Sequence, residues 1–330
     1  MSLRGRKGIR QQIGMTVASD DGFERHIVAC PNCPREGKIT MFTIQDHQEK
    51  YRIYTLRDEE AQSWLKVAPE RGGIITEFGV KNHNFLYLDE ATFNDPATSV
   101  RGGIPVLFPI CGQLENDQYQ WNGKQYKMKP HGFARNHPWQ VVGTETNGQS
   151  AIKLRFAADA QTQSVYPFDF ELIFTYALKG NQLTITQEYH NHSETMMPVY
   201  AGFHPYFLAG DKSKIMYDTD GTIYLDYEDK KIKPFRKDFD LTNVSIAKLI
   251  LDQAKNGLSF QDPVLGHRIR LQYGREFRYP LLWSSVGKNF ICVEPFMAKM
   301  NALNTHEDIQ LIKPGGVLAT YLTITGEICV

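Results

Sequence analysis

The stretch FELIFTYALKGNQLTITQEY, residues 170–189, decides the fold class of this chain. It holds two runs rich in aromatic and branched residues, Phe170–Leu178 and Leu183–Tyr189, which Lys179–Gln182 connects. Gly180 offers the backbone freedom that a tight turn requires. In the second run successive side chains face opposite sides, which separates Leu183, Ile185 and Gln187 from Thr184, Thr186 and Glu188. Alternation beside a turn predicts an antiparallel β-hairpin.

The same pattern continues from Tyr51 towards the end of the chain. A second predicted hairpin joins Gln118–Trp121 to Lys124–Met128 through Asn122-Gly123, because these two residues favour the positive φ angles of a type I′ turn. The other predicted strands are Tyr51–Leu56, Ile74–Val80, Phe85–Leu88, Thr222–Tyr227, Arg268–Tyr273, Leu281–Val286, Phe290–Val293 and Val317–Thr325.

One segment, Val244–Gln253, predicts a helix. Within it Ile246, Leu249 and Ile250 recur at helical spacing and fall on one face. Many strands with few helices predict an all-β protein, namely a large antiparallel β-sandwich with few short helices.

The composition excludes several classes of protein. Among 330 residues, 37 lysines and arginines balance 37 aspartates and glutamates, so no overall charge favours nucleic acid or an anionic membrane. No apolar run is long enough to span a bilayer. The 19 Phe, 16 Tyr and 4 Trp suit a sandwich core and also a sugar cleft. We therefore expect the protein to bind a small molecule, and neither nucleic acid nor a membrane. We expect it to be a monomer or a homodimer.

The first forty residues differ from the rest. Basic residues precede any acidic one, and no apolar periodicity appears before Ile39. The apolar run of a signal peptide is missing, and an organellar transit peptide is the less favoured alternative. We expect residues 1–40 to be an N-terminal extension that folding and activity do not need, with Met41 as an alternative start, and residues 41–330 to form a single domain.

The five cysteines do not form a recognisable disulfide framework. Cys30 and Cys33 form a C-x-x-C without the further ligands of a zinc site, so two unpaired thiols are the simpler interpretation. His190 and His192 could share a strand face, but without a third ligand we interpret them as surface histidines. We expect no metal site and a reducing, cytoplasmic compartment.

Three segments place titratable side chains among glycines, prolines and aromatic residues: HGFAR at 131–135, GFHPYF at 202–207 and CVEP at 292–295. His204, in its aromatic setting, could donate a proton to an ether oxygen and take it back near neutral pH. Considered alone, it would more simply be a buried structural histidine.

Glu294 ends an apolar run, where partial burial would raise its pKa towards that of a useful general base. A strand-end pair with an arginine is the alternative. His131, between Pro130 and Gly132, is expected at a loop tip or a strand end, where site residues often lie. Arg101 and Arg135 offer planar donor groups that suit hydroxyl pairs, carboxylates or phosphate.

Four motifs in series resemble those of the aldose 1-epimerase (mutarotase) family. They are RGGIPVLFP at 101–109, HGFAR at 131–135, FHPYF at 203–207 and VEP at 293–295, and the similarity runs from about Tyr51 to the C-terminus. The resemblance implies a galactose mutarotase-like β-sandwich with a sugar cleft. It also implies that His204 is the general acid, Glu294 the general base and His131 a substrate-orienting residue, without any metal or cofactor.

The resemblance leaves the sugar open. Arg101 and Arg135 match arginines that approach the phosphate in the hexose-6-phosphate branch, whereas residues 294–298 and 301–304 are more similar to the branch acting on free aldoses. Asp252 matches an acidic sugar-binding position, although a solvated aspartate at a helix end is the simpler interpretation.

We therefore predict an aldose 1-epimerase that interconverts the anomers of an aldohexose, with a hexose-6-phosphate 1-epimerase as the alternative. From another class, a non-catalytic carbohydrate-binding or sugar-sensing protein would use the same cleft. A glycoside hydrolase would need a second carboxylate beside the scissile bond, and no motif supplies one.

Overall fold

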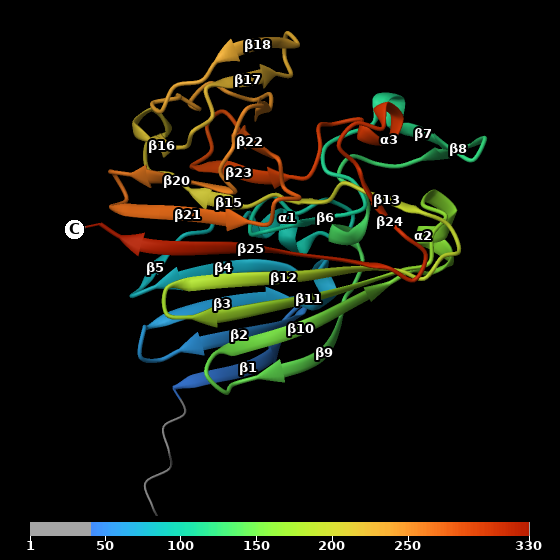
Figure 1. Cartoon of the computed structure of the whole chain (residues 1–330). Coiled ribbons are helices and arrows are strands. Elements are labelled where there is room, and N and C mark those ends of the chain that lie inside the picture. Colours follow the sequence, from blue (N-terminus) through green and yellow to red (C-terminus); the bar gives the residue numbers. More distant parts are fainter. Residues whose placement is uncertain (1–40, 330) are drawn as a thin grey trace, which may run out of the picture. The chain divides into compact units, whose positions relative to one another are not determined.

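The computed structural model describes residues 41–329, which form antiparallel sheets with only three short α-helices (Figure 1). The first sheet runs in chain order through β1 (Phe42–Gln48), β2 (Arg52–Asp58), β3 (Ser63–Ala68), β4 (Ile74–Val80) and β5 (His83–Asn84). The helices are α1 (Glu90–Asn94), α2 (Ala160–Val165) and α3 (Ala302–Thr305). The predicted all-β class with few short helices is confirmed.

Two eight-stranded sheets form the rest of the framework. The order of one is β16 (Met216–Asp218), β20 (Gly257–Asp262), β21 (His267–Tyr273), β25 (Val317–Ile328), β12 (Gln182–Asn191), β11 (Phe170–Lys179), β10 (Ser150–Ala157) and β9 (Gln140–Glu145). The order of the other is β18 (Lys231–Pro234), β17 (Ile223–Asp226), β19 (Lys248–Ile250), β22 (Tyr279–Trp283), β23 (Phe290–Phe296), β14 (Gly202–Phe203) and β6 (Val106–Leu107), with β15 (Tyr206–Leu208) also paired to β23.

Shorter elements close the ends of these sheets. Two-stranded ribbons pair β7 (Gln118–Trp121) with β8 (Lys124–Lys127), and β13 (Met197–Val199) with β24 (Gln310–Ile312). Single turns of 3₁₀ helix are η1 (Pro69–Arg71), η2 (Glu115–Asp117), η3 (Ala134–Asn136) and η4 (Lys212–Lys214).

The sheets pack face to face around one continuous hydrophobic cluster. The sheet of β1 to β5 lies against β10, β11 and β25, as the overlapping strands of Figure 1 indicate. On the other side of the molecule, Phe207 of β15 packs on Phe260 of β20, with ring centroids 5.2 Å apart. The sheet that contains β23 is thereby held on the same core, which is the sandwich arrangement that period-two alternation favours.

Both predicted hairpins are confirmed. In the first, Lys179 pairs with Gln182, so the loop is reduced to two residues and Gly180 takes a φ of +60°. In the second, Asn122 and Gly123 take φ angles of +47° and +75°, as a type I′ turn requires. The three residues of β12 that were predicted to share one face, Leu183, Ile185 and Gln187, are all buried.

The predicted helix at Val244–Gln253 is wrong. The segment contains β19, which pairs with β17 on one side and with β22 on the other. Leu249 and Ile250 are both buried, but Ile246 is 39% exposed, so the three do not share a buried face. A short apolar run does not distinguish helix from strand, and here pairing on both edges decides the outcome.

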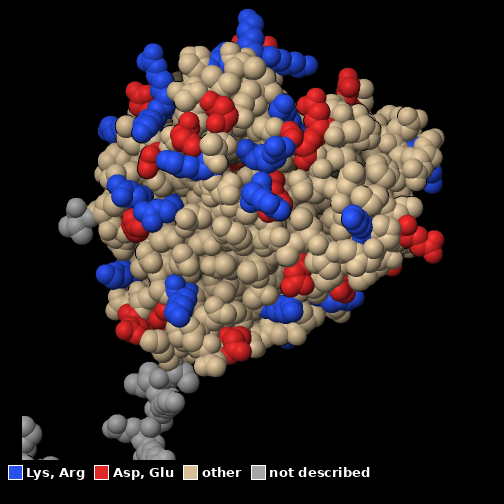
Figure 2. Space-filling view, in the orientation of Figure 1, with Lys and Arg blue, Asp and Glu red and all other residues tan. Residues whose placement is uncertain are grey.

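The surface carries no field of a single sign on the face seen in Figure 2, where basic and acidic side chains are interspersed. This agrees with the balanced composition. No helix within residues 41–329 is long and apolar enough to cross a lipid bilayer. The expected N-terminal extension, with Cys30 and Cys33, lies outside the described residues.

Candidate active site

His204 occupies a break between two strand segments that pair with the same neighbour. β14 ends at Phe203 and β15 begins at Tyr206, and both lie beside β23. The His204 backbone N–H donates to the Pro105 carbonyl at 3.1 Å. Its ring stacks on Tyr206 at 4.6 Å between centroids and meets the edge of Trp283 at 5.6 Å. The imidazole is therefore held on both of its flanks.

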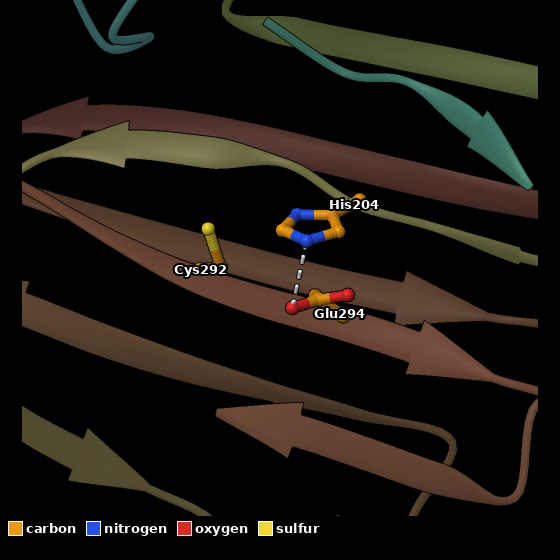
Figure 3. Close-up of side chains that lie close together, drawn as sticks. All are labelled: His204, Cys292 and Glu294. Atoms are coloured by element: carbon orange, nitrogen blue, oxygen red, sulfur yellow. Dashed lines mark ion pairs between the residues drawn. The ribbon is translucent and has the colours of Figure 1, made fainter. Parts of the chain in front are cut away.

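Glu294 lies near the middle of β23, opposite Leu281 of β22. Its Oε1 is 3.4 Å from Nε2 of His204, the approach drawn as a dashed line in Figure 3. Both side chains are buried, with 1% of Glu294 and 7% of His204 exposed. The structure thus brings together two residues that are far apart in sequence and that the motifs predicted as a proton-transferring pair.

His131 lies at the same site in an unusual backbone conformation. Its φ is +67° and that of Gly132 is +69°, so the chain turns sharply there. The backbone N–H of Gly112 donates to Nδ1 of His131 at 3.1 Å. Because Nδ1 accepts, the proton of the neutral ring must be on Nε2, which makes His131 a hydrogen-bond donor. Its ring centroid is 5.5 Å from that of His204.

Burial governs the protonation of these three groups. It raises the pKa of Glu294 well above its ordinary value, and the positive charge of Arg135 offsets only part of this effect. It lowers the pKa of His204 to about 3, with Arg135 as the next cause. It also lowers the pKa of His131, which keeps that ring neutral. Between the pKa values of His204 and Glu294, the pair holds a single proton.

The pair opens onto a cavity of about 400 Å³. Its lining includes His131, His204, Glu294 and Arg101, together with Phe296 from the segment 294–298. It also includes residues that no motif indicated: Tyr227, Lys230, Trp283 and Met300. A larger cavity of about 720 Å³ is lined by other residues, Phe133, His137 and Val165 among them, and by neither proton carrier. The chemistry therefore assigns the site to the smaller cavity, whose volume suits a small molecule.

The two predicted arginines lie in different places. Arg101 lines the cavity, with its guanidinium carbon 5.7 Å from the centroid of the Trp283 ring. Arg135, in η3, is not part of the lining and donates from one terminal nitrogen to the Pro130 carbonyl at 3.0 Å. It is half-buried, and its positive charge lowers the pKa of both Glu294 and His204.

A comparison with known families identifies the chain. The model of the family named Aldose 1-epimerase matches residues 52–271, about two thirds of the sequence. The chain belongs to this family. Three of the four motifs quoted from the sequence lie within the matched range, and VEP at 293–295 lies beyond its end.

Individual relatives of this aldose 1-epimerase agree with the family match. The Escherichia coli K12 protein named "Putative glucose-6-phosphate 1-epimerase" is 25% identical over 282 residues, covering 80% of this chain and 85% of that protein. The crystal structure of the Slr1438 protein from Synechocystis sp. PCC 6803 is 34% identical with a TM-score of 0.83, covering 87% of this chain and 100% of that one. A galactose mutarotase related enzyme from Lactobacillus acidophilus, 19% identical with a TM-score of 0.69 over 86% of this chain and 97% of its own, shows the same fold.

Asp252 of this epimerase lies outside the cavity lining. Its carboxylate accepts hydrogen bonds from the backbone N–H groups of Thr222 and Ile223 at 2.9 and 3.1 Å, and from the Thr222 hydroxyl. Because β19 ends just before it, Asp252 follows a strand and joins that strand to β17, rather than ending a helix.

The lining residues that sequence reasoning missed come from segments without a motif. Trp283 ends β22, and Tyr227 and Lys230 lie in the turn between β17 and β18. An aromatic residue at a strand end was a weak signal for Trp283 and Tyr227. Nothing in the sequence singled out Lys230, because its place at the cavity depends on how distant strands pair.

Proposed function

We propose that His204 and Glu294 carry the protons by which this aldose 1-epimerase interconverts the α and β anomers of a hexose. The observation that supports the assignment is the 3.4 Å approach of a ring nitrogen and a carboxylate oxygen at the cavity floor. An acid and a base that face one substrate are what opening of a hemiacetal requires.

The reaction needs one proton on the pair. Glu294 takes the proton of the C1 hydroxyl while His204 donates one to the ring oxygen, so the C1–O5 bond breaks and an aldehyde forms. Rotation about C1–C2 exposes the other face, and the reverse transfers close the ring. In the free protein burial keeps the proton on the carboxyl group, so hydrogen bonds from the sugar to the carboxylate must move it to His204 before the ring opens.

His131 would assist through its Nε2–H. Because its Nδ1 is already engaged by the Gly112 backbone, the ring presents a donor to the cavity, where it can stabilise charge that develops on a sugar oxygen. A neutral ring is required for a tautomer of this kind, and burial supplies that condition. The role is one of orientation and charge stabilisation, not of proton exchange.

The pH dependence of kcat/KM follows from the opposite pKa shifts. Below the pKa of His204, about 3, the pair gains a second proton and loses its base. Above the raised pKa of Glu294 it loses its last proton and with it the acid. We expect a plateau that spans the ordinary imidazole pKa of 6.5, in exchange rates measured by NMR and corrected for the buffer rate. A fall of the rate centred at pH 6.5 would contradict this assignment.

The sugar that we favour is a hexose 6-phosphate, with the free aldohexose as the alternative. Glu294 is the one carboxylate in the lining formed by the described residues, and it is buried, whereas Arg101 and Lys230 bring positive charge. Both cations are exposed, as contact with a phosphate at the cavity mouth requires. The name of the Escherichia coli relative agrees with this choice.

Lys230→Gln should separate the two substrates. Loss of one charged contact to phosphate is expected to raise KM for glucose 6-phosphate by about tenfold and to leave exchange of free glucose unchanged. The matched control is Lys231→Gln, which removes the neighbouring exposed charge outside the lining. Equal effects of Lys230→Gln on both sugars would argue for the free aldose.

The non-catalytic alternative has a direct test. A carbohydrate-binding or sugar-sensing protein would bind these sugars, yet its exchange rates for glucose, galactose and glucose 6-phosphate would not exceed those of buffer.

We also place the protein in a reducing compartment such as the cytoplasm, which the free thiols of Cys111, Cys292 and Cys329 support.

A further inference from the structure

A third potential ligand group lies beside the proposed proton carriers. Cys292 and Glu294 are two residues apart on β23, so their side chains leave the strand on the same face. The thiol sulfur, a carboxylate oxygen of Glu294 and a ring nitrogen of His204 lie within 4.8 Å of one another. Figure 3 shows the side chains of Cys292 and Glu294 beside the imidazole ring of His204. The mechanism above uses two of these three groups and leaves the thiol without a role.

The cluster has unused bonding capacity. Nδ1 of His204 and Oε2 of Glu294 are buried and have no hydrogen-bond partner among residues 41–329. The residues themselves are more than nine-tenths buried, and Cys292 is fully buried. Buried polar atoms are normally paired in proteins. Their lone pairs are therefore available to a ligand that bonds to nitrogen, oxygen and sulfur together.

The chemistry of the three donors selects the kind of ligand. Imidazole, thiolate and carboxylate are the donors that Zn²⁺ takes in proteins, often three at a time with one further position open. Ca²⁺ and Mg²⁺ prefer oxygen donors only, so the thiol excludes them. We propose that His204, Cys292 and Glu294 form a binding site for a thiophilic divalent cation such as Zn²⁺ or Cd²⁺, and that the bound ion switches off anomer exchange.

The bound ion would inhibit the enzyme because the proton carriers would donate to it the lone pairs that proton transfer requires. Coordination takes the lone pair of His204 and the carboxylate of Glu294, and neither can then accept or donate a proton. As the ion binds, the proton held by the His204–Glu294 pair and the proton of the Cys292 thiol both pass to solvent, and nothing is oxidised or reduced. The inhibitory consequence rests on the proposed function of this pair, whereas binding of the ion does not.

The ion can enter and fit with small changes. His204 and Glu294 both line the cavity, so an ion meets these two donors first and Cys292 behind them. Bond lengths of about 2.0–2.3 Å place the donors of a tetrahedral zinc site roughly 3.6 Å apart. From separations within 4.8 Å, the three atoms must therefore approach one another by no more than about 1.2 Å.

Binding is tested with Cd²⁺ and Zn²⁺ alone, in thiol-free buffer. The full-length chain carries Cys30→Ser and Cys33→Ser, because that C-x-x-C could bind the same ions. We expect one ion per chain by calorimetry and a sulfur-to-cadmium charge-transfer band in the ultraviolet. Cys292→Ser should abolish the band and weaken affinity at least about tenfold, whereas the control Cys329→Ser should change neither. An unchanged band and affinity in Cys292→Ser would overturn the proposal.

Two further variants keep the test sharp if Cys292→Ser does not fold. His204→Asn and Glu294→Gln retain the thiol, and each should weaken Cd²⁺ binding. Both variants are also expected to be inactive without metal, because each lacks one of the two proposed proton carriers. Binding that is unaffected by both variants would overturn the proposal. Zn²⁺ should also inhibit exchange by the parent chain, reversibly with a chelator, and should inhibit Cys292→Ser less, relative to its own metal-free rate. If the parent chain binds the ion but shows no exchange with any sugar, the proposed function fails and the ion site stands.

Discussion

Glu294→Gln and His204→Asn should each remove anomer exchange, lowering the rate by about 100- to 10,000-fold, while sugar binding largely survives. Each substitution keeps the shape and some hydrogen bonding of the side chain but deletes one of the two proton carriers. Because ring opening needs an acid and a base at once, either loss stops both directions. NMR exchange spectroscopy gives the rate, and calorimetry gives the affinity for the sugar.

A matched control is available elsewhere in the chain. His190 and Glu188 on β12 form another histidine–glutamate contact, with Nε2 and Oε2 3.0 Å apart, outside the cavity. Glu188→Gln and His190→Asn make the same chemical changes and should leave the exchange rate unaltered. Retention of exchange in Glu294→Gln with unaltered sugar affinity would show that another group acts as the base.

Gly132→Ala should have the second large effect, on stability and on activity together. A Cβ at this position would lie 2.1 Å from the carbonyl oxygen of Phe108, and the φ of +69° already disfavours a side chain. The obstacle is backbone, so no side-chain rotation relieves it. Strain and overpacking each cost about 1–3 kcal/mol, and we expect the free energy of unfolding to fall by about 3 kcal/mol. Displacement of the neighbouring His131 should also lower the exchange rate.

Gly148→Ala isolates the contribution of the close contact. Its φ is +78°, similar to that of Gly132, but nothing lies within 4 Å of the added Cβ. Urea unfolding of this variant should therefore show the backbone strain alone, about 1 kcal/mol. Equal losses of stability in the two variants would contradict the close approach of Gly132 to Phe108.

Local patterns predicted those parts of the fold that local chemistry determines. The two hairpins were predictable because Gly180 and Asn122-Gly123 permit tight turns and the flanking residues alternate. The segment Val244–Gln253 was mistaken for a helix because its spacing is compatible with both structures. The partners that make it a strand, β17 and β22, are distant in sequence and leave no local mark.

In the candidate site, too, the sequence predicted some residues correctly, whereas the positions of others depend on distant partners. The motifs around His131, His204 and Glu294 predicted residues that the structure gathers at one cavity. Arg135 and Asp252 were grouped with them, yet neither side chain lines that cavity. A motif indicates that a residue lies in a loop or at a strand end, but it does not indicate where the side chain points. The direction of its side chain depends on partners such as Pro130 for Arg135 and Thr222 for Asp252.

The placement of Glu294 on β23 has a consequence for how this chain can change in evolution. β23 is held by β22 on one side and by β14 and β15 on the other, so its pairing fixes which side chains face His204. Loss or gain of a single residue within β23 ahead of Glu294, between Phe290 and Val293, would turn Glu294 to the opposite face of the sheet if the earlier pairing were kept. The number of residues within β23 is therefore constrained as tightly as the identity of Glu294, whereas we expect insertions and deletions to be tolerated in the β22–β23 turn, residues 284–289, which lies outside the pairing.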